Sequence, residues 1–98
     1  GSVSVKTDIL RNMIIVLLRG VLTPAEQNLA KTFEGMLSVK KTRSDLVESG
    51  SDYLKQLVES ISGSKVVSFH TDVSTRTGER VMVFILSDNL EDRLDSVR

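Results

Sequence analysis

The chain has 98 residues, with 13 basic and 13 acidic side chains and a formal net charge of zero. This length predicts one small domain with a single hydrophobic core. A neutral chain lacks the bulk attraction for phosphate backbones that nucleic-acid-binding proteins use, and it is compatible with self-association. The chain contains no cysteine, which excludes disulfides, thiol catalysis and zinc–thiolate sites and fits a cytoplasmic protein.

The ends of the chain and its longest apolar run indicate the domain organisation. Gly1 and Ser2 are typical of a cleaved tag, so we expect the native chain to extend upstream. The longest unbroken apolar run, Met13–Leu18, is much shorter than the roughly 20 residues that span a bilayer. We predict a single domain over residues 3–87 and a C-terminal tail with a short helix over residues 88–98.

Two strands joined by a tight turn are predicted for the first part of the chain. Apolar and polar residues alternate over residues 3–10, which is typical of a half-buried strand. Arg11-Asn12 predicts the turn, because Asn tolerates a positive φ. The continuous apolar run from Met13 predicts a strand in a central position, buried on both faces or covered by a partner.

A helical region begins at the sequence Thr23-Pro24-Ala25-Glu26. We expect Thr23 to cap the helix and Glu26 to reach back to the N–H of Thr23, which together form a capping box. Apolar residues then recur at helical spacing toward Gly63, which stands at the expected C′ position. Two alternatives remain open: one helix over residues 24–62, or two helices that meet near Ser49-Gly50-Ser51.

A second hairpin is predicted after the helical region. Residues 65–72 alternate in hydrophobicity, with Val67 and Phe69 expected on one side of the strand. Residues 73–78 are rich in turn-forming side chains, and residues 79–86 form a second apolar strand. Phe69 and Phe84 are expected to pack in the core rather than to stack on RNA bases.

A short C-terminal helix completes the predicted fold. Ser87-Asp88-Asn89 predicts its cap, with Asp88 and Glu91 at capping-box spacing. Its apolar stripe, formed by Leu90, Leu94 and Val97, either closes the core or docks on a second subunit. The order ββ-α(α)-ββ predicts an α+β fold, in which two hairpins form a four-stranded, mainly antiparallel sheet with the helical region on one face.

The sequence offers little that is typical of catalysis. His70 is the only histidine, and Asp72 lies two residues further along the same strand face. Without cysteines or a second histidine, no metal-ligand spacing is present, and there is no phosphate-binding glycine-rich loop or nucleophile elbow. We therefore predict a protein that is not an enzyme and has no cofactor, no metal and no catalytic residues.

Two polar groups are candidates for binding a small anionic ligand. Lys40, Lys41 and Arg43 form the only basic cluster, in the middle of the helical region. A polar loop on a rigid hairpin is the second candidate, because binding residues often lie on loops held by a scaffold. Its candidate residues are Asp72, Arg76, Gly78, Glu79 and Arg80.

Three segments together resemble a bacterial domain family, the MpsC component of a Na⁺-translocating, membrane-potential-generating system. The first runs from Asp8 to Glu26 and includes the Leu-Thr-Pro-Ala-Glu helix start. The others are Gly63–Ser68, and Asp72 followed by the Thr-Gly-Glu-Arg hairpin at residues 77–80. The resemblance covers most of Val5–Leu86, although members usually carry a further N-terminal helical stretch.

The resemblance implies a bacterial accessory or regulatory protein rather than an ion channel, because a domain without a membrane segment does not translocate ions by itself. We expect a non-enzymatic regulatory or assembly module, self-associating as a homodimer. Its further partner would be a membrane protein of a cation- or bicarbonate-related system, or an upstream domain of the same chain. Nucleic acid is not expected as a partner. Sensing of a small anionic ligand is the alternative function.

Overall fold

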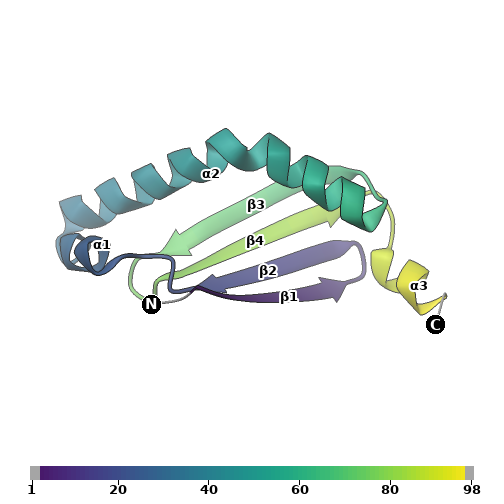
Figure 1. Ribbon diagram of the computed structural model, residues 1–98, viewed down its shortest axis with the longest axis horizontal. Coiled ribbons are helices and arrows are strands. Elements are labelled where there is room, and N and C mark those ends of the chain that lie inside the picture. Colours follow the sequence, from purple (N-terminus) through teal and green to yellow (C-terminus); the bar gives the residue numbers. More distant parts are fainter. Residues whose placement is uncertain (1–2, 97–98) are drawn as a thin grey trace.

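The computed structural model describes residues 3–96 and has the predicted α+β architecture (Figure 1). The strands are β1 (Ser4–Leu10), β2 (Met13–Arg19), β3 (Val66–Ser74) and β4 (Glu79–Leu86). The helices are α1 (Pro24–Leu29), α2 (Phe33–Ser62) and α3 (Leu90–Asp95). The expectations for Gly1, Ser2 and Val97 lie outside the described residues.

The two hairpins combine into one antiparallel sheet with the strand order β1-β2-β4-β3. The apolar strand β2 is central, as predicted, and pairs with β1 on one side and β4 on the other. In the first hairpin turn the positive φ of 56° belongs to Arg11, not to Asn12 as expected. Asn12 is instead held by its side-chain amide, which donates to the carbonyl of Leu86 at 3.3 Å.

The helical region contains two helices, but the break lies at residues 30–32 rather than near Gly50. Thr32 caps α2 by accepting a hydrogen bond from the N–H of Gly35 at 3.0 Å. A Cβ at Gly35 would stand 1.8 Å from the carbonyl oxygen of Leu29, so this sharp turn between the helices requires glycine. Gly50 lies inside α2, which continues through it without interruption.

The core is formed between α2 and the strands β2, β3 and β4. Phe84 and Leu86 of β4 are buried with Leu90 of α3, and Leu54 and Val58 of α2 pack against them. Phe69 stacks on Phe84 with ring centroids 4.8 Å apart, which confirms their predicted place in the core. Leu90 therefore closes the core, and α3 is capped by Asn89 rather than by Asp88.

An irregularity in β3 changes which of its residues face the core. The pairing of β3 with β4 shifts between Val66 and Ser68, which is a local bulge. Val66 and Phe69 both pack against the core, whereas Val67 is 67% exposed. The expectation that Val67 and Phe69 share one side was wrong, because the extra residue reverses the alternation.

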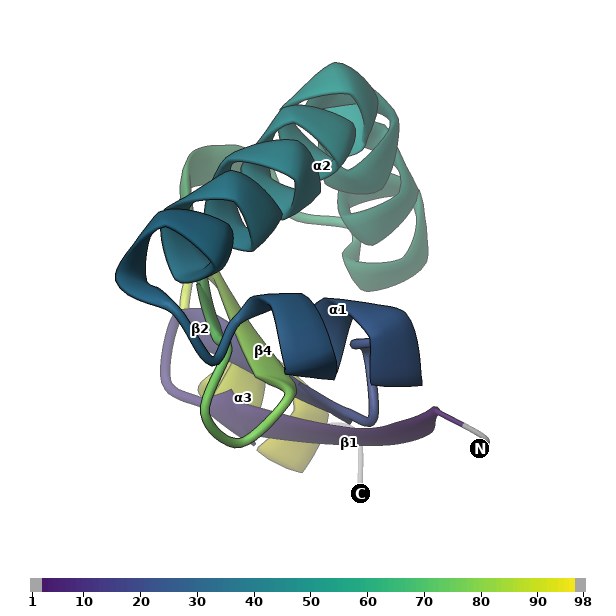
Figure 2. The ribbon, with the colours of Figure 1, turned by 90° about the vertical axis from the view of Figure 1, so that its left-hand side faces the viewer.

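The long helix covers only part of the sheet. In Figure 1, α2 runs lengthwise above β3 and β4, and β1 lies at the far edge; Figure 2 shows the same separation end-on. Every residue of β1 is exposed. The chain has an accessible surface of 6689 Å² and a radius of gyration of 15.5 Å. A compact monomer of this mass has about 5,500 Å² and about 13 Å. The isolated chain is thus extended and leaves an unusually large surface uncovered.

Candidate functional site

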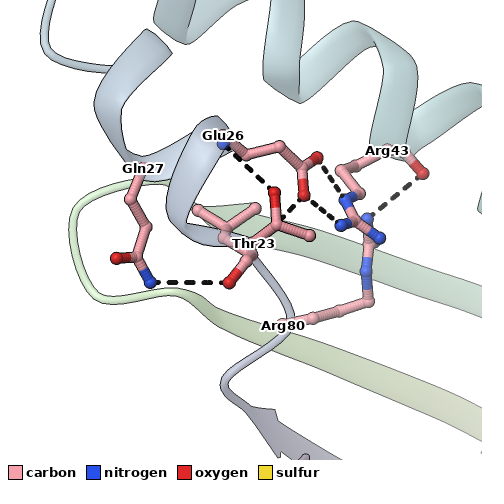
Figure 3. A network of polar contacts seen from close by, with 6 residues as sticks. Thr23, Glu26, Gln27, Arg43 and Arg80 are labelled. Atoms are coloured by element: carbon pink, nitrogen blue, oxygen red, sulfur yellow. Dashed lines mark hydrogen bonds and ion pairs between the residues drawn. The ribbon is translucent and has the colours of Figure 1, made fainter. Parts of the chain in front are cut away.

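The predicted capping box at the start of α1 is present and forms part of a larger polar cluster (Figure 3). Thr23 Oγ1 accepts a hydrogen bond from the N–H of Glu26 at 3.2 Å, and Glu26 Oε1 accepts from the N–H of Thr23 at 3.0 Å. The same carboxylate receives both Nε, at 2.8 Å, and Nη2 of Arg43 from α2. One acidic side chain therefore caps α1 and binds α1 to α2.

The charges of this cluster stabilise one another. The hydrogen bonds from Arg43, and next that from the N–H of Thr23, lower the pKa of Glu26 from 4.5 to about 2. The same pair raises the pKa of Arg43. The Glu26 side chain is 22% exposed and that of Arg43 is 25% exposed, so the pair is only partly screened by solvent.

Arg80 connects α2 to the sheet beneath it. This β4 residue is 4% exposed; its Nη1 donates to Thr71 Oγ1 at 2.9 Å and its Nη2 donates to the backbone carbonyl of Arg43 at 3.3 Å. Burial, and next the nearby Arg43 guanidinium, lower the pKa of Arg80. Arg43 and Arg80 thus meet, although they are 37 positions apart in the sequence (Figure 3).

The remaining residues of the basic cluster are also engaged. Lys40 of α2 forms an ion pair with Asp72 of β3 at 3.4 Å, and Lys41 pairs with Asp45 one turn along the helix at 2.8 Å. A hydrogen bond from the N–H of Val73 is the main cause that lowers the pKa of Asp72. The structure thus brings the helix and hairpin candidates together at two contacts, Lys40 with Asp72 and Arg43 with Arg80. Each of the three cations of the basic cluster lies next to a carboxylate.

The turn between β3 and β4 holds the other candidates. Gly78 has a φ of 71°, its N–H donates to the carbonyl of Ser74 at 2.9 Å, and its carbonyl accepts from the N–H of Val21 at 3.1 Å. Glu79 pairs with Arg19 across the strands at 3.1 Å, and Arg76 is exposed. These contacts shape the turn, and a ligand-binding role for the residues stays a prediction.

His70 is exposed on β3, and its Nε2 lies 3.2 Å from Ser68 Oγ. Its neighbour Asp72 is engaged by Lys40, so no His–Asp hydrogen bond is formed. Over residues 3–96, no group of three or more His, Cys, Asp or Glu side chains is arranged to hold a metal ion.

An apolar groove, which the sequence reasoning missed, lies between α2, α3 and the part of the sheet that α2 leaves open. Its volume is about 570 Å³. Ile9, Ile14 and Val16 form its floor, and its walls include Leu57 and Ile61 of α2 and Leu94 of α3. Ile61 is 78% exposed and Leu57 is 42% exposed. The signal in the sequence was the spacing of four residues between Tyr53, Leu57 and Ile61, of which Leu57 and Ile61 line the groove.

The opposite side of the sheet carries a second apolar surface, which we call the reverse face. Because side chains alternate along a strand, the residues facing away from α2 are those that neighbour the core residues in sequence. Three cross-strand pairs between β2 and β4 form this face: Met13 with Ile85, Ile15 with Val83, and Leu17 with Val81. Val81 is 38% exposed and the other five are partly buried.

Comparisons with known proteins identify bacterial relatives of this chain. Within residues 3–96, no helix is both long enough and apolar enough to cross a membrane. No solved structure gives a significant match. The chain is 63% identical over 97 residues to the uncharacterized protein YbcI of Bacillus subtilis (strain 168), covering 99% of this chain and 78% of YbcI. It is 27% identical over 101 residues to the uncharacterized protein YrhF of the same organism, covering 100% of this chain and 81% of YrhF.

A family profile identifies the group to which this chain belongs. The profile described as "Na+-translocating membrane potential-generating system (MpsC)" matches residues 1–88, which include the helix start, the polar cluster and both hairpins. The resemblance noted at the Leu-Thr-Pro-Ala-Glu and Thr-Gly-Glu-Arg segments is thereby confirmed, and the chain belongs to the MpsC family.

Proposed function

We propose that this protein is a non-enzymatic accessory or assembly module of a Na⁺-translocating system, and that it acts by protein contacts, including contact with a second copy of itself. The observation that carries this proposal is the apolar groove between α2, α3 and the β1–β2 hairpin. The predicted cytoplasmic location and a membrane-protein partner are part of the proposal.

The groove fits a docking role because its apolar side chains are held open to solvent by the fold. Leu57, Ile61 and Leu94 stand on two different helices and converge above Ile9 of β1. Covering apolar surface gains about 25 cal/mol per Å² removed from water. A partner that inserts an apolar segment between α2 and β1 would therefore bind without requiring a charged anchor.

The polar residues support a structural role better than a chemical one. Glu26, Arg43 and Arg80 are engaged with one another and with backbone groups, and Asp72 is paired with Lys40. A general base needs a free lone pair within reach of a substrate proton. A His70→Ala variant is expected to keep full biological activity, and loss of activity in a folded His70→Ala protein would contradict the non-enzymatic reading.

The docking role is tested in cells that lack their own copy of the protein and receive a plasmid copy. The readout is the membrane potential under a sodium load, measured with a potentiometric dye. Leu57→Glu and Ile61→Glu place a charge in the groove at exposed positions, so we expect a folded protein that fails to restore the potential. Leu46→Glu is the matched control, because Leu46 is 59% exposed on the same helix but does not line the groove. Full restoration by both groove variants would refute the proposal.

Anion sensing is the second candidate, and one observation favours it. Arg80 is 4% exposed, and its hydrogen bonds go to a hydroxyl and a backbone carbonyl, both neutral. A phosphate or carboxylate ligand that reached Arg80 would stabilise the native state by mass action and raise the melting temperature. A panel of such anions that leaves the melting temperature unchanged would rule this candidate out.

A further inference from the structure

The two edges of the sheet are protected to different degrees. The β3 edge carries a bulge between Val66 and Ser68, α2 packs against this strand, and Lys40 of α2 reaches Asp72 on it. The β1 edge has no bulge and no proline: its seven residues pair with β2 in one continuous register and all are exposed, and the helix that contacts this strand is the short α3, near Ile9. An unprotected edge strand is a template for pairing with another strand.

The direction of the free backbone groups on β1 follows from the hydrogen-bond pattern. Asn12 directly precedes β2, and its carbonyl accepts a hydrogen bond from the N–H of Leu86 at 2.7 Å. The even-numbered residues of β2 are therefore bonded toward β4. In an antiparallel ladder the bonding direction alternates, and odd-numbered residues of β2 therefore bond toward β1. Their partners on β1 are the even-numbered residues, from Ser4 to Leu10. Val5, Thr7 and Ile9 consequently direct their N–H and C=O groups away from the sheet.

These three outward-facing residues are arranged symmetrically about Thr7. If a second β1 strand lies antiparallel with a two-fold axis at Thr7, Val5 of each copy stands opposite Ile9 of the other. The same register places Lys6 of each copy opposite Asp8 of the other, on the opposite face of the ribbon. Opposite charges in cross-strand positions are favourable, and like charges are unfavourable.

The neighbouring registers lack this complementarity. Outward-facing residues can only pair with outward-facing residues, so the register can change only in steps of two. One such shift places Lys6 opposite Lys6 of the other copy, and the other shift places Asp8 opposite Asp8. The charges of the strand thus select the register with Thr7 on the axis.

We propose that two copies of this chain pair through β1 about Thr7, which joins their four-stranded sheets into one continuous antiparallel sheet. This inference rests on the self-association in the proposed function and names its surface. The chain exposes about 1,100 Å² more surface than a compact monomer of its mass, so surface is available for contact with a second copy. Ile9 also borders a depression shared with Leu94 of α3, where Val5 of the second copy gains an apolar neighbour.

The pairing also explains the position of the apolar groove. Thr7 and Ile9 of β1 belong to the groove lining, so in the dimer the grooves of the two copies adjoin across the two-fold axis. A partner protein would then meet one apolar surface built from two chains. The walls of the groove, formed by α2 and α3, take no part in the pairing, whereas Thr7 and Ile9 of β1 belong to both surfaces.

The register is tested by charge exchange, with the dimer dissociation constant measured by analytical ultracentrifugation. Lys6→Asp and Asp8→Lys each place like charges opposite one another in two symmetric positions, so each weakens the dimer by about tenfold or more. The double variant Lys6→Asp/Asp8→Lys restores the dimer, and an equimolar mixture of the two single variants forms a heterodimer. Lys65→Asp makes the same change in charge as Lys6→Asp, but at an exposed position next to β3, the opposite edge of the sheet. This control variant leaves the dimer unchanged.

A backbone variant provides an independent test. Thr7→Pro removes an N–H that points away from β2, so the β1–β2 ladder is retained and the circular dichroism spectrum is unchanged. Because the variant is present in both copies, it removes the two central hydrogen bonds of the dimer, and the protein becomes monomeric. A wild-type protein that stays monomeric at high concentration would overturn both the pairing and the self-association. A dimer insensitive to all these variants would overturn the pairing alone, and would assign self-association to another surface.

Discussion

The carboxylate of Glu26 has two separable roles, and two substitutions distinguish them. It completes the capping box of α1 and forms a bidentate ion pair with Arg43 of α2. Glu26→Gln removes the charge but keeps an acceptor for the N–H of Thr23, because glutamine also serves at this position of a capping box. Glu26→Ala removes both interactions.

The expected loss in the free energy of unfolding follows from the change in the pKa of Glu26. Lowering the pKa of Glu26 from 4.5 to about 2 would correspond to about 3 kcal/mol if solvent played no part. Because the carboxylate is partly exposed, solvent screening reduces this value, and we expect Glu26→Gln to lower the free energy of unfolding by about 1–2 kcal/mol at pH 7. Glu26→Ala should lose about 0.5–1 kcal/mol more through the capping box.

The pH dependence has a definite sign. Since the native pKa of Glu26 is below its unfolded value, its contribution is fully present above pH 4.5 and declines as the pH falls toward about 2. Urea unfolding of the wild type and both variants between pH 7 and pH 2 measures this directly. Equal stabilities of wild type and Glu26→Gln at pH 7, or a difference that stays constant down to pH 2, would refute the reasoning.

Three further substitutions test the packing and the backbone by urea unfolding. Phe84→Ala should cost about 3–5 kcal/mol, because Phe84 is 2% exposed and stacks on Phe69; a loss below 1 kcal/mol would contradict the assigned core. Gly63→Ala should cost about 1–2 kcal/mol, because the C-cap of α2 has a φ of 72°. Gly50→Ala should instead stabilise by up to about 1 kcal/mol, because it lies inside α2 with open space at Cβ; destabilisation would indicate a bend there.

Features that depend on neighbouring residues in the chain were predictable. The capping box was recognised from Thr23, Pro24 and Glu26, because a cap is formed by side chains within one helical turn. The two hairpins and the central place of β2 followed from alternation and from a continuous apolar run. The helix break was not found, because it depends on how closely Gly35 approaches Leu29 rather than on the weak helix propensity of Gly50.

For the polar candidate residues, too, the sequence indicated the residues but not their distant contacts. Lys40, Arg43 and Arg80 were recognised as notable from composition and spacing. The pairing of Lys40 with Asp72, and of Arg80 with the carbonyl of Arg43, required α2 to lie above β3 and β4, whereas the pairing of Arg43 with Glu26 required the turn between α1 and α2.

The sequence by itself determined the order of the two hairpins and the helical region, the capping box at Thr23 and the family, since each depends on residue types at short spacing. Only the tertiary structure decided which cations are neutralised, where the apolar groove opens, and which sheet edge stays unprotected. The physical reason is that α2 is a rigid rod wide enough to cover two strands of a four-stranded sheet, so its position over β3 and β4 leaves β1 and part of β2 open.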